Sequence, residues 1–261
     1  MTREPPTVVK LGGDTLAEQH ATLKGVADAA RHRPLVVVHG GGKRLSGWLA
    51  RLGVVSRFDA GRRVTDDESL PVAVAVLRGL VNAEVVAALQ GLGSPAVGIS
   101  GVDGGLIRAA RVEALGRVGR VVGTRPDLIG DLLRAGFVPV VAPIALDEQG
   151  ELCNVNADEV AGGLAAALGG RLLLLTDTDG VRDRHGARIA NMAAADVEGL
   201  IADGTISGGM IPKVRAAAAV IAAGGLEVVI ADGRGPDALR QALADASFGT
   251  RVADRGSSGP R

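Results

Sequence analysis

Two short apolar runs that end in glycines constrain this chain more than any other feature. The run VVKLGG at 8–13 has the composition of a buried strand that stops at a lysine and two glycines. The run VVVHGGG at 36–42 repeats the arrangement. A cation beside backbone N–H groups that no side chain covers suits a phosphate, whereas either run alone fits an ordinary tight turn from strand to helix equally well.

The rest of the chain alternates apolar runs of four to six residues with segments of helix length. The predicted strands are 7–11, 35–38, 95–99, 138–142, 172–176 and 227–231. The predicted helices are 15–31, 43–52, 68–91, 126–135, 157–168 and 210–224. This order favours an α/β fold with a mainly parallel sheet covered on both faces, in which ligands collect at the carboxyl ends of the strands. The Gly-rich segments 100–125 and 146–153 are expected to be hairpins or edge strands of this scheme, and a second block of strand, loop and helices begins near residue 176.

Composition narrows the class of protein. With 29 basic and 29 acidic residues in 261, the chain has no global charge that would attract nucleic acid or an acidic membrane. Aromatic residues make up 2% and there is no Tyr, which argues against a stacking platform for single-stranded nucleic acid. The single cysteine, Cys153, cannot form an internal disulfide and fits a reducing compartment. The first seven residues do not have the pattern of a signal peptide, and no charge-free run of about 18 apolar residues occurs, so we expect a cytoplasmic protein.

The segment 68–91 is apolar around most of its circumference. Such a helix is buried on several sides, either in the core or at a contact between subunits, and we favour a dimer interface.

Three polar motifs follow predicted strands or precede predicted helices. GRRVTD at 61–66 places Arg62 and Arg63 before a helix, where one of them can hold a carboxylate, although for the motif taken alone a solvated arginine pair is the better explanation. In NVNADE at 154–159, Asn156 and Glu159 fit a capping box, which leaves Asn154 and Asp158 unexplained. TDTDGV at 176–181 fits a hairpin turn, a metal loop or the edge of a nucleotide site.

A lysine also stands where a helix begins. In SGGMIPK at 207–213, the proline starts a helix and Lys213 falls in its first turn, a poor place for a positive charge unless an anion is near. Neither a P-loop nor the dinucleotide pattern G-x-G-x-x-G is present, and the four histidines lack the spacing of metal ligands. Two lysines, two glycine turns, an aspartate and an arginine fit phosphoryl transfer, in which the protein positions reactants and neutralises charge.

In the order and spacing of these motifs, from Val8 to Val252, the chain resembles the amino-acid kinase family. The landmarks are VVKLGG (8–13), VVVHGGG (36–42), GRRVTD (61–66), LVN (80–82), GISGVDGGLI (98–107), GFVPVVAPI (136–144), NVNADEVAG (154–162), LLLLTDTDGV (172–181) and GGMIPKV (208–214). Within that family the likeness is to the branch that phosphorylates N-acetyl-L-glutamate.

The resemblance implies an open αβα sandwich with two lobes. Residues 1–175 would bind N-acetyl-L-glutamate and form the dimer, and residues 176–261 would bind ATP. The implied reaction is transfer of the γ-phosphoryl group of ATP to the side-chain carboxylate of N-acetyl-L-glutamate, which yields N-acetylglutamyl 5-phosphate in arginine biosynthesis.

The resemblance also implies roles for single residues. Lys10 and Lys213 would flank the phosphoryl group in transfer, and Asp158 would orient both lysines. Backbone N–H groups of Gly13, Gly41 and Gly42 would donate to the phosphoryl group or to the substrate. The side chains of Arg63 and Asn154 would hold the α-carboxylate and the acetamide region of the substrate. The nucleotide would lie against Asp177, Thr178, Asp179, Gly180, Val181, Arg182, Thr205, Ile206 and Ser207. Mg²⁺ would be held largely by phosphate oxygens and water, without a dedicated protein site.

Regulation and substrate choice depend on where the chain departs from its relatives. Arginine-inhibited members carry an extra N-terminal helix that links dimers into hexamers; about seven residues precede the first strand here, so we expect a homodimer insensitive to arginine. Arg62 adds a charge beside the substrate arginine, and Val102 stands where a lysine is common, as in relatives that phosphorylate α-aminoadipate or glutamate attached to a carrier protein. That alternative needs a basic docking surface, for which Arg57, Arg62, Arg63, Arg108 and Arg111 are the candidates. A silent regulator with the same fold is a further alternative, but Lys10, Asp158 and Lys213 are all present.

Overall fold

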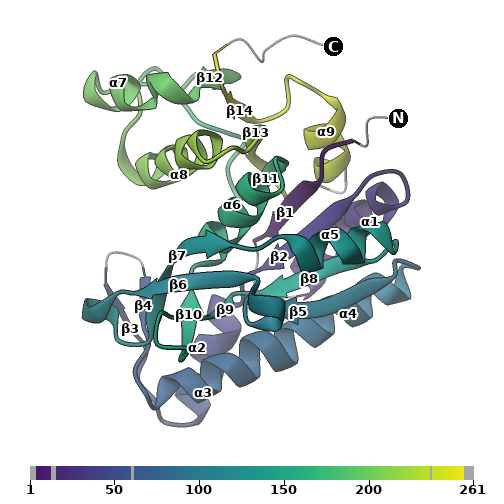
Figure 1. Ribbon diagram of the computed structural model, residues 1–261. Coiled ribbons are helices and arrows are strands. Elements are labelled where there is room, and N and C mark those ends of the chain that lie inside the picture. Colours follow the sequence, from purple (N-terminus) through teal and green to yellow (C-terminus); the bar gives the residue numbers. More distant parts are fainter. Residues whose placement is uncertain (1–3, 13–15, 60–61, 236, 256–261) are drawn as a thin grey trace.

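The computed structural model describes residues 4–12, 16–59, 62–235 and 237–255. Within these residues, an eight-stranded sheet has the order β12-β14-β13-β11-β1-β2-β8-β5 (Figure 1). Its strands are β1 (Thr7–Leu11), β2 (Leu35–His39), β5 (Ala96–Ser100), β8 (Val138–Ala142), β11 (Arg171–Thr176), β12 (Asn191–Ala193), β13 (Glu227–Asp232) and β14 (Thr250–Ala253). Neighbouring strands are parallel except β13 and β14, which confirms the predicted mainly parallel α/β sheet.

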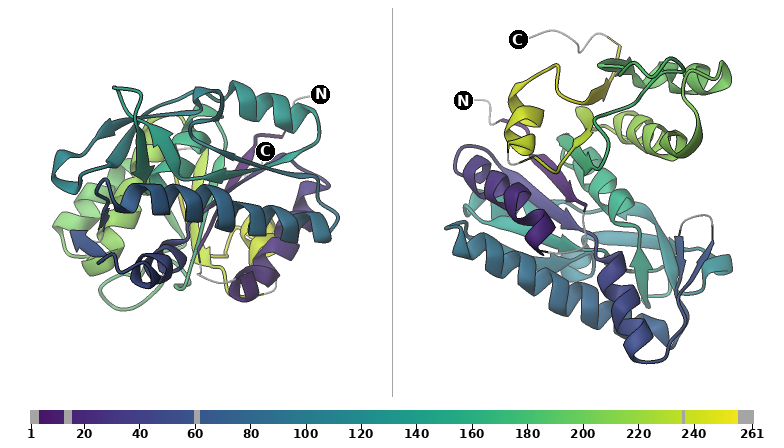
Figure 2. Two further views of the ribbon diagram at one scale, coloured as in Figure 1. Left: turned by 90° about the horizontal axis from the view of Figure 1, so that it is seen from below. Right: turned by 180° about the vertical axis from the view of Figure 1, so that it is seen from behind.

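Helices cover both faces of this sheet, as Figure 2 shows from two further sides. Successive strand residues point to opposite faces, so Val9 packs in one apolar cluster with Leu23, Val85 and Leu239, whereas Val8 packs in the other with Leu164. The first cluster joins the sheet to α1 (Leu16–Ala30), α4 (Asn82–Gly91) and α9 (Ala238–Ala244). The second joins it to α5 (Asp127–Arg134), α6 (Ala157–Ala167) and α8 (Ile211–Ala222). Every described strand of the sheet core is therefore buried on two sides, which explains why the strands read as unbroken apolar runs.

The register of the central strands brings the glycine motifs to one edge. Lys10 is level with Val38 and with Leu174, and Leu11 is level with His39. The carboxyl ends of β1, β2 and β11 are thus neighbours, and the segments that follow them lie at the same edge of the sheet.

A second, smaller unit stands beside the main sheet. Its strands close on themselves in the order β10-β7-β6-β9, within the described part of the chain. Their bounds are β6 (Ile107–Arg111), β7 (Val118–Thr124), β9 (Ile144–Leu146) and β10 (Leu152–Val155). The prediction that 100–125 and 146–153 form hairpins is partly right, because β6 pairs with β7, and β9 with β10, in antiparallel fashion. The alternative prediction, that these segments are edge strands of the main sheet, is wrong, because they pair with one another and not with β5.

The predicted helix 68–91 is a single long helix, Ser69–Gly91, called the long helix below. It comprises α3 (Ser69–Val74), a π-helical segment η1 (Ala75–Val81) and α4. By length and composition it is the one helix among the described residues that is apolar enough to cross a membrane. Ala73, Val76, Leu77, Val85 and Leu89 are nevertheless buried in the protein's own core, so it is a core helix.

The remaining elements are short connections or cover the ends of the sheet. They are α2 (Gly42–Arg51), the hairpin β3 (Arg57–Asp59) and β4 (Arg62–Val64), η2 (Asp103–Gly105), η3 (Glu113–Leu115), η4 (Ala194–Asp196), α7 (Val197–Ala202) and η5 (Gly208–Met210). Figure 1 shows α7, α8, β12, β14 and α9 together at one end of the molecule and the long helix at the other. The predicted division near residue 176 remains a prediction, and the sheet itself continues across it, since β11 pairs with β13.

Candidate active site

A pocket opens where β2 ends. It has a volume of ≈ 200 Å³, smaller than the about 300–1,000 Å³ of a drug-sized site, and fits one small metabolite. We call it the Arg63 pocket. Its walls are Gly40, Gly41, Gly42, Leu45, Phe58, Arg62, Arg63, Leu77, Val118, Gly119, Pro143, Asn154, Val155, Asn156 and Ala157. All four residues expected to bind the substrate, Gly41, Gly42, Arg63 and Asn154, are among them.

The glycine turn brings bare backbone to the pocket. Gly41 has φ 137°, a conformation that side chains rarely adopt, and a Cβ there would come within 2.8 Å of Leu77 Cδ2 on the long helix. Helix α2 starts at Gly42, so the N–H groups of its first turn lack partners within the helix. The turn therefore presents N–H groups and the positive end of a helix dipole to an anion.

Arg63 reaches the pocket from β4 and is held there by neutral oxygens. Its guanidinium donates to Ser56 Oγ at 2.7 Å, Ser46 Oγ at 2.7 Å and the Gly42 carbonyl at 2.9 Å. Partial burial lowers the pKa of Arg63 from its usual value, yet an arginine remains cationic at neutral pH. No described carboxylate forms an ion pair with it, so its charge is available to an anionic ligand.

Arg62 has a different role, because it pairs with Glu159 at 2.5 Å. This contact corrects the predicted capping box. Asn156 does cap α6, since its side chain accepts from the N–H groups of Asp158 at 2.7 Å and Glu159 at 3.4 Å. The Glu159 carboxylate turns instead to Arg62 and to the Val121 N–H, at 3.3 Å, since a cation attracts it more strongly than a neutral N–H group does.

Asn154, at the end of β10, faces the pocket from the opposite wall. Its Nδ2 donates to Thr65 Oγ1 at 3.2 Å, and Thr65 is fully buried. The contact fixes the amide, which leaves its oxygen to accept from a ligand.

Lys10 and Asp158 meet at the carboxyl end of β1. Lys10 Nζ lies 3.0 Å from Asp158 Oδ1, and both side chains are partly exposed. Asp158 stands in the first turn of α6, where a carboxylate is favoured by the helix dipole. Two residues almost 150 positions apart thus place a lysine ammonium group at the edge of the sheet where β1 and β2 end.

Lys213 starts α8 at the same end of the molecule. A Cβ on Gly162 would meet Val220 Cγ2 at 2.8 Å, and one on Gly224 would lie 3.6 Å from the Ala166 carbonyl. Helices α6 and α8 therefore run parallel, and their N-termini, which carry Asp158 and Lys213, lie at one edge. As predicted, Pro212 is in the first turn of α8, and Lys213 forms no ion pair within the described residues.

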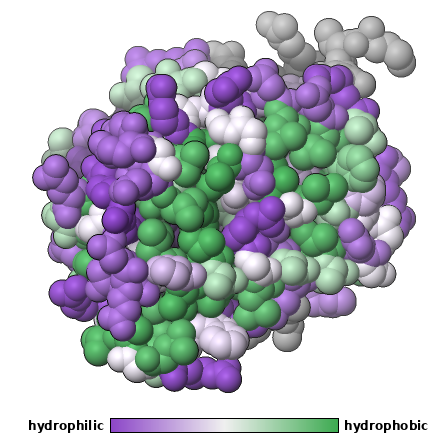
Figure 3. Space-filling view, turned by 60° about the horizontal axis from the view of Figure 1, so that its bottom comes forward, coloured by the Kyte–Doolittle hydropathy of each residue, from purple (hydrophilic) through white to green (hydrophobic). Residues whose placement is uncertain are grey.

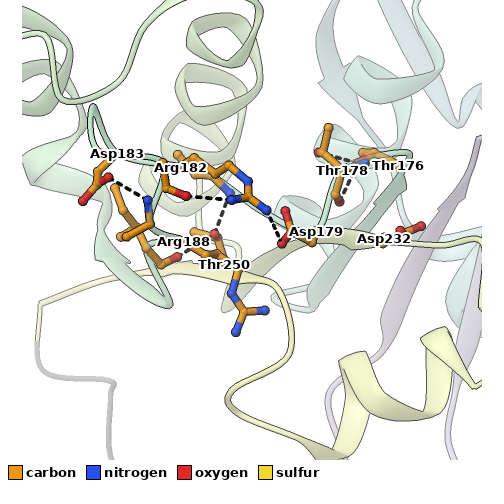
Figure 4. A network of polar contacts seen from close by, with 12 residues as sticks. Thr176, Thr178, Asp179, Arg182, Asp183, Arg188, Asp232 and Thr250 are labelled. Atoms are coloured by element: carbon orange, nitrogen blue, oxygen red, sulfur yellow. Dashed lines mark hydrogen bonds and ion pairs between the residues drawn. The ribbon is translucent and has the colours of Figure 1, made fainter.

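The 176–182 loop leaves β11 beside this edge, and Figure 4 shows its polar contacts. Thr178 donates its N–H to Thr176 Oγ1 at 3.1 Å, and Arg182 lies 2.8 Å from Asp179. Further along, the N–H of Val181 donates to Thr250 Oγ1 at 2.8 Å, which ties the loop to β14. These contacts are mostly local and on the surface.

The other residues predicted to bind the nucleotide lie in or next to these elements. Asp177 and Gly180 belong to the 176–182 loop, and Ile206 is buried in the same apolar cluster as Val181. Asp203 accepts from the Thr205 N–H at 2.8 Å, and Ser207 precedes η5. Gly13 lies outside the described residues, so the structure does not test its predicted role.

Three of the five arginines that are candidates for a basic docking surface are paired with carboxylates. Arg57 pairs with Asp66 at 3.5 Å, Arg62 with Glu159, and Arg111 with Asp147 and Glu151. Arg63 points into its pocket. Only Arg108 is exposed without a described ion pair.

Sequence reasoning missed several residues that shape the pocket. Ser46 and Ser56 hold Arg63, and Phe58 stacks with its guanidinium at 4.6 Å from the ring centroid. One signal was present: Ser46 follows Gly42 by four residues, the spacing of one helix face. Nothing local pointed to Ser56 or Phe58, because the hairpin β3–β4 was not predicted.

Comparisons with known proteins agree with this geometry. The family model of the amino acid kinase family matches residues 5–232. The chain is 45% identical to an acetylglutamate kinase of Rubrobacter xylanophilus over 252 residues, 96% of this chain and 98% of the relative. It is 41% identical to an acetylglutamate kinase of Halorhodospira halophila over 265 residues, 94% and 88% of the two chains. Among solved structures, an N-acetylglutamate synthase of Neisseria gonorrhoeae shares the fold, with a TM-score of 0.81 at 22% identity over 97% of this chain and 60% of that one. The matched motifs, the sheet and the length of the similarity agree: this chain belongs to the amino acid kinase family.

Proposed function

We propose that the chain transfers the γ-phosphoryl group of ATP to the side-chain carboxylate of N-acetyl-L-glutamate. The observation that carries the proposal is the Arg63 guanidinium, a cation that only neutral oxygens hold, inside a pocket of single-metabolite size beside a glycine turn. The relatives at 41–45% identity bear the same activity in their names.

In this proposal the Arg63 pocket orients the acceptor. Arg63 binds the α-carboxylate through a bidentate pair of hydrogen bonds, and the Asn154 side-chain oxygen accepts from the acetamide N–H. The side-chain carboxylate then points toward the edge of the sheet where Lys10 stands. Because a glutamate side chain is already ionised at neutral pH, no general base is needed to make the nucleophile.

The charge that develops in transfer is met by fixed groups. A carboxylate oxygen forms the new bond to the γ-phosphorus, the bond to the bridging oxygen breaks, and ADP leaves with the electron pair. Lys10 and Lys213 neutralise the equatorial oxygens, and the N–H groups of Gly41 and Gly42 donate to them. Gly13 would act in the same way. Asp158 holds Lys10 at 3.0 Å and keeps its ammonium group aimed at the transferred group.

ATP would lie against the residues of the 176–182 loop and of 205–207, between the N-terminal ends of α6 and α8. Among the described residues, no group of three or more His, Cys, Asp or Glu side chains is arranged to bind a metal ion. In this proposal Mg²⁺ arrives on the nucleotide and keeps its phosphate oxygens and waters as ligands. When bound, the ion would neutralise charge on the β- and γ-phosphates, and the one carboxylate of this site that could face it, directly or through water, is Asp158.

The decisive measurement is ADP release coupled to NADH oxidation, with free N-acetyl-L-glutamate or N-acetyl-aminoadipate as the acceptor. We expect turnover with the former, and a loss of roughly 10³-fold in kcat for Lys213→Ala at the same KM for the acceptor. No turnover of N-acetyl-L-glutamate by the folded protein would contradict the proposed reaction. A fully active Lys213→Ala would contradict only the assigned role of that lysine.

We also propose that the protein is a cytoplasmic homodimer joined through the long helix. Its outer face carries Ala75, Gly79, Ala83 and Ala87, all exposed and small. Figure 3 shows hydrophobic residues gathered on this side of the molecule. Analytical ultracentrifugation should give the dimer mass for the wild type and the monomer mass for Ala83→Arg. The matched control Ala202→Arg, at an exposed alanine of α7 at the other end of the molecule, should stay dimeric.

A further inference from the structure

A histidine and an asparagine lie buried behind the glycine turn, and the mechanism above uses neither. His39 is 0% exposed at the end of β2, and Asn82 is 1% exposed on the long helix. Polar side chains at this depth require hydrogen-bond partners, and their partners show what the pair does.

The contacts of His39 fix its tautomer. Its Nδ1 lies 2.7 Å from the Gly40 carbonyl oxygen, which can only accept, so Nδ1 carries the proton. In the neutral ring Nε2 is then an acceptor, and Asn82 Nδ2 lies 3.1 Å from it. Asn82 therefore supplies the hydrogen bond that keeps the proton on the nitrogen facing Gly40.

Asn82 is itself held in one orientation. Its Nδ2 lies 2.9 Å from the Val140 carbonyl and 3.4 Å from the Ile99 carbonyl, and Arg78 donates to its Oδ1 at 3.4 Å. A flipped amide would place Oδ1 against two carbonyl oxygens and the amide nitrogen against a guanidinium.

The backbone leaves room for this amide. A Cβ on Gly98, in the neighbouring strand β5, would stand 2.1 Å from Asn82 Oδ1. A bare backbone at position 98 is therefore required for the Asn82 side chain to lie where it does.

The chain of contacts ends on the peptide unit between Gly40 and Gly41. That peptide is trans, as is every described peptide bond, so its C=O and N–H point in opposite directions. His39 binds the carbonyl from the buried side. The N–H of Gly41 consequently faces away from the core, and Gly40, Gly41 and Gly42 all line the Arg63 pocket.

We propose that His39 and Asn82 are positioning residues: Asn82 sets the tautomer of His39, and His39 anchors the Gly40 carbonyl so that the Gly41 N–H is aimed at the bound acceptor and the phosphoryl group. The proposal rests on the proposed function, since it concerns the same pocket. In this proposal, residues of β2, β5 and the long helix together fix the direction of the Gly41 N–H group.

A merely structural pair would give a different result on mutation. If the two side chains only fill the core, their loss lowers the melting temperature and leaves the kinetics of the folded fraction unchanged. If they aim the Gly41 N–H, the loss falls on the acceptor and on transfer, while the KM for ATP stays the same.

The test compares kcat and both KM values in His39→Leu, His39→Asn and the wild type. Leucine removes the donor to Gly40, whereas the asparagine amide places an N–H close to where Nδ1 stands. We expect kcat/KM for N-acetyl-L-glutamate to fall 10- to 100-fold in His39→Leu, with the KM for ATP within about twofold, and His39→Asn to recover most of the loss. Val85→Ala, a buried residue one turn further along the long helix, is the matched control and should lose stability alone.

Two further variants keep the test open if His39→Leu does not fold. Gly98→Ala displaces the Asn82 amide, and Asn82→Ala removes it; each should lower kcat/KM for the acceptor in the direction of His39→Leu. Folded variants with wild-type kcat/KM, or a Val85→Ala that loses as much, would overturn the positioning role. The wild type separates the two proposals. If it does not phosphorylate N-acetyl-L-glutamate, the proposed function is rejected. If it does and the variants have the same kinetics, only the positioning role is rejected.

Discussion

The Arg63 pocket and the 176–182 loop are built in different ways. Around the pocket, polar contacts join residues far apart in the chain: Arg62 bonds Glu159, 97 positions away, and Asn154 bonds Thr65, 89 positions away. In the loop, Thr176 bonds Thr178 and Asp179 bonds Arg182, two and three positions away. Local contacts form in any conformation that keeps the turn, whereas distant ones exist only when the whole fold is in place.

This difference divides the work between the two regions. If the proposed function is right, a pocket fixed by the fold is pre-organised for one acceptor, and we expect selectivity to reside there. One distant contact, from the Val181 N–H to Thr250, ties the loop to β14, but its other described pairs are local. In the proposed function, the exposed part of the loop can therefore adjust to a nucleotide. Substitutions should therefore cost far more on the pocket side than on the loop side.

Arg63→Ala should give the largest effect. It removes two charge-assisted hydrogen bonds to the acceptor, and we expect kcat/KM for N-acetyl-L-glutamate to fall roughly 10³-fold with the KM for ATP unchanged. Arg182→Ala, an arginine of the loop, is the matched control and should raise the KM for ATP only a few-fold. Steady-state kinetics with each substrate varied in turn will measure both, and equal losses in the two variants would break the comparison.

The buried His39 gives the pocket side a pH dependence in stability. Burial lowers the pKa of His39 from 6.5 to about 4; the Gly40 carbonyl opposes this shift and the nearby Arg78 cation, itself 3.6 Å from Asp103, adds to it. Between these two values the unfolded chain binds a proton that the folded one does not, so stability falls as the pH is lowered from 6.5.

Urea unfolding at pH 7 and pH 5 measures this contribution. We expect the wild type to lose about 2 kcal/mol through this histidine, and His39→Asn to lack that part of the loss. The paired carboxylates titrate alike in both proteins, so the difference isolates the ring. If the free energy of unfolding fell equally with pH in the wild type and in His39→Asn, protonation of His39 would carry no cost. The ring would then be less enclosed than its contacts indicate.

The same contrast explains what the sequence predicted. Six of the eight described strands of the main sheet and the starts of α6 and α8 were predicted, because apolar runs, Asn156 and Pro212 are local signals. Strands β12 and β14 and helix α9 were missed, since three, four and seven residues give too weak a pattern. The small unit β10-β7-β6-β9 was misplaced because nothing local tells a strand which partner it will pair with.

The site followed the same rule. Residues of local motifs, such as Lys10, Asp158 and the glycines, were predicted from the order of motifs in a family resemblance, and their roles remain predictions. Their supports, Ser56 for Arg63 and Asn82 for His39, were not, because each acts across the fold. The pairing of Glu159 with Arg62 overrode a capping box that the local pattern predicted.

Arg62→Leu should have an intermediate effect. It removes a cation from the wall of the pocket and leaves the Glu159 carboxylate without its ion pair, so we expect the KM for the anionic N-acetyl-L-glutamate to rise roughly tenfold. The double variant Arg62→Leu, Glu159→Gln removes both charges and should recover most of the affinity. If it does not, Arg62 itself contacts the acceptor, and the pocket has two substrate arginines instead of one.

Asp179→Asn should have the smallest effect. The Asp179–Arg182 pair is exposed, at 49% and 57%, and such pairs contribute at most about 1 kcal/mol because water and salt screen them. We expect an unchanged melting temperature and a KM for ATP within about threefold of the wild type, with the acceptor KM unaffected. A tenfold loss for ATP that persists at 0.5 M salt would mean that Asp179 contacts the nucleotide directly, and that the loop is as firmly organised for its ligand as the pocket is.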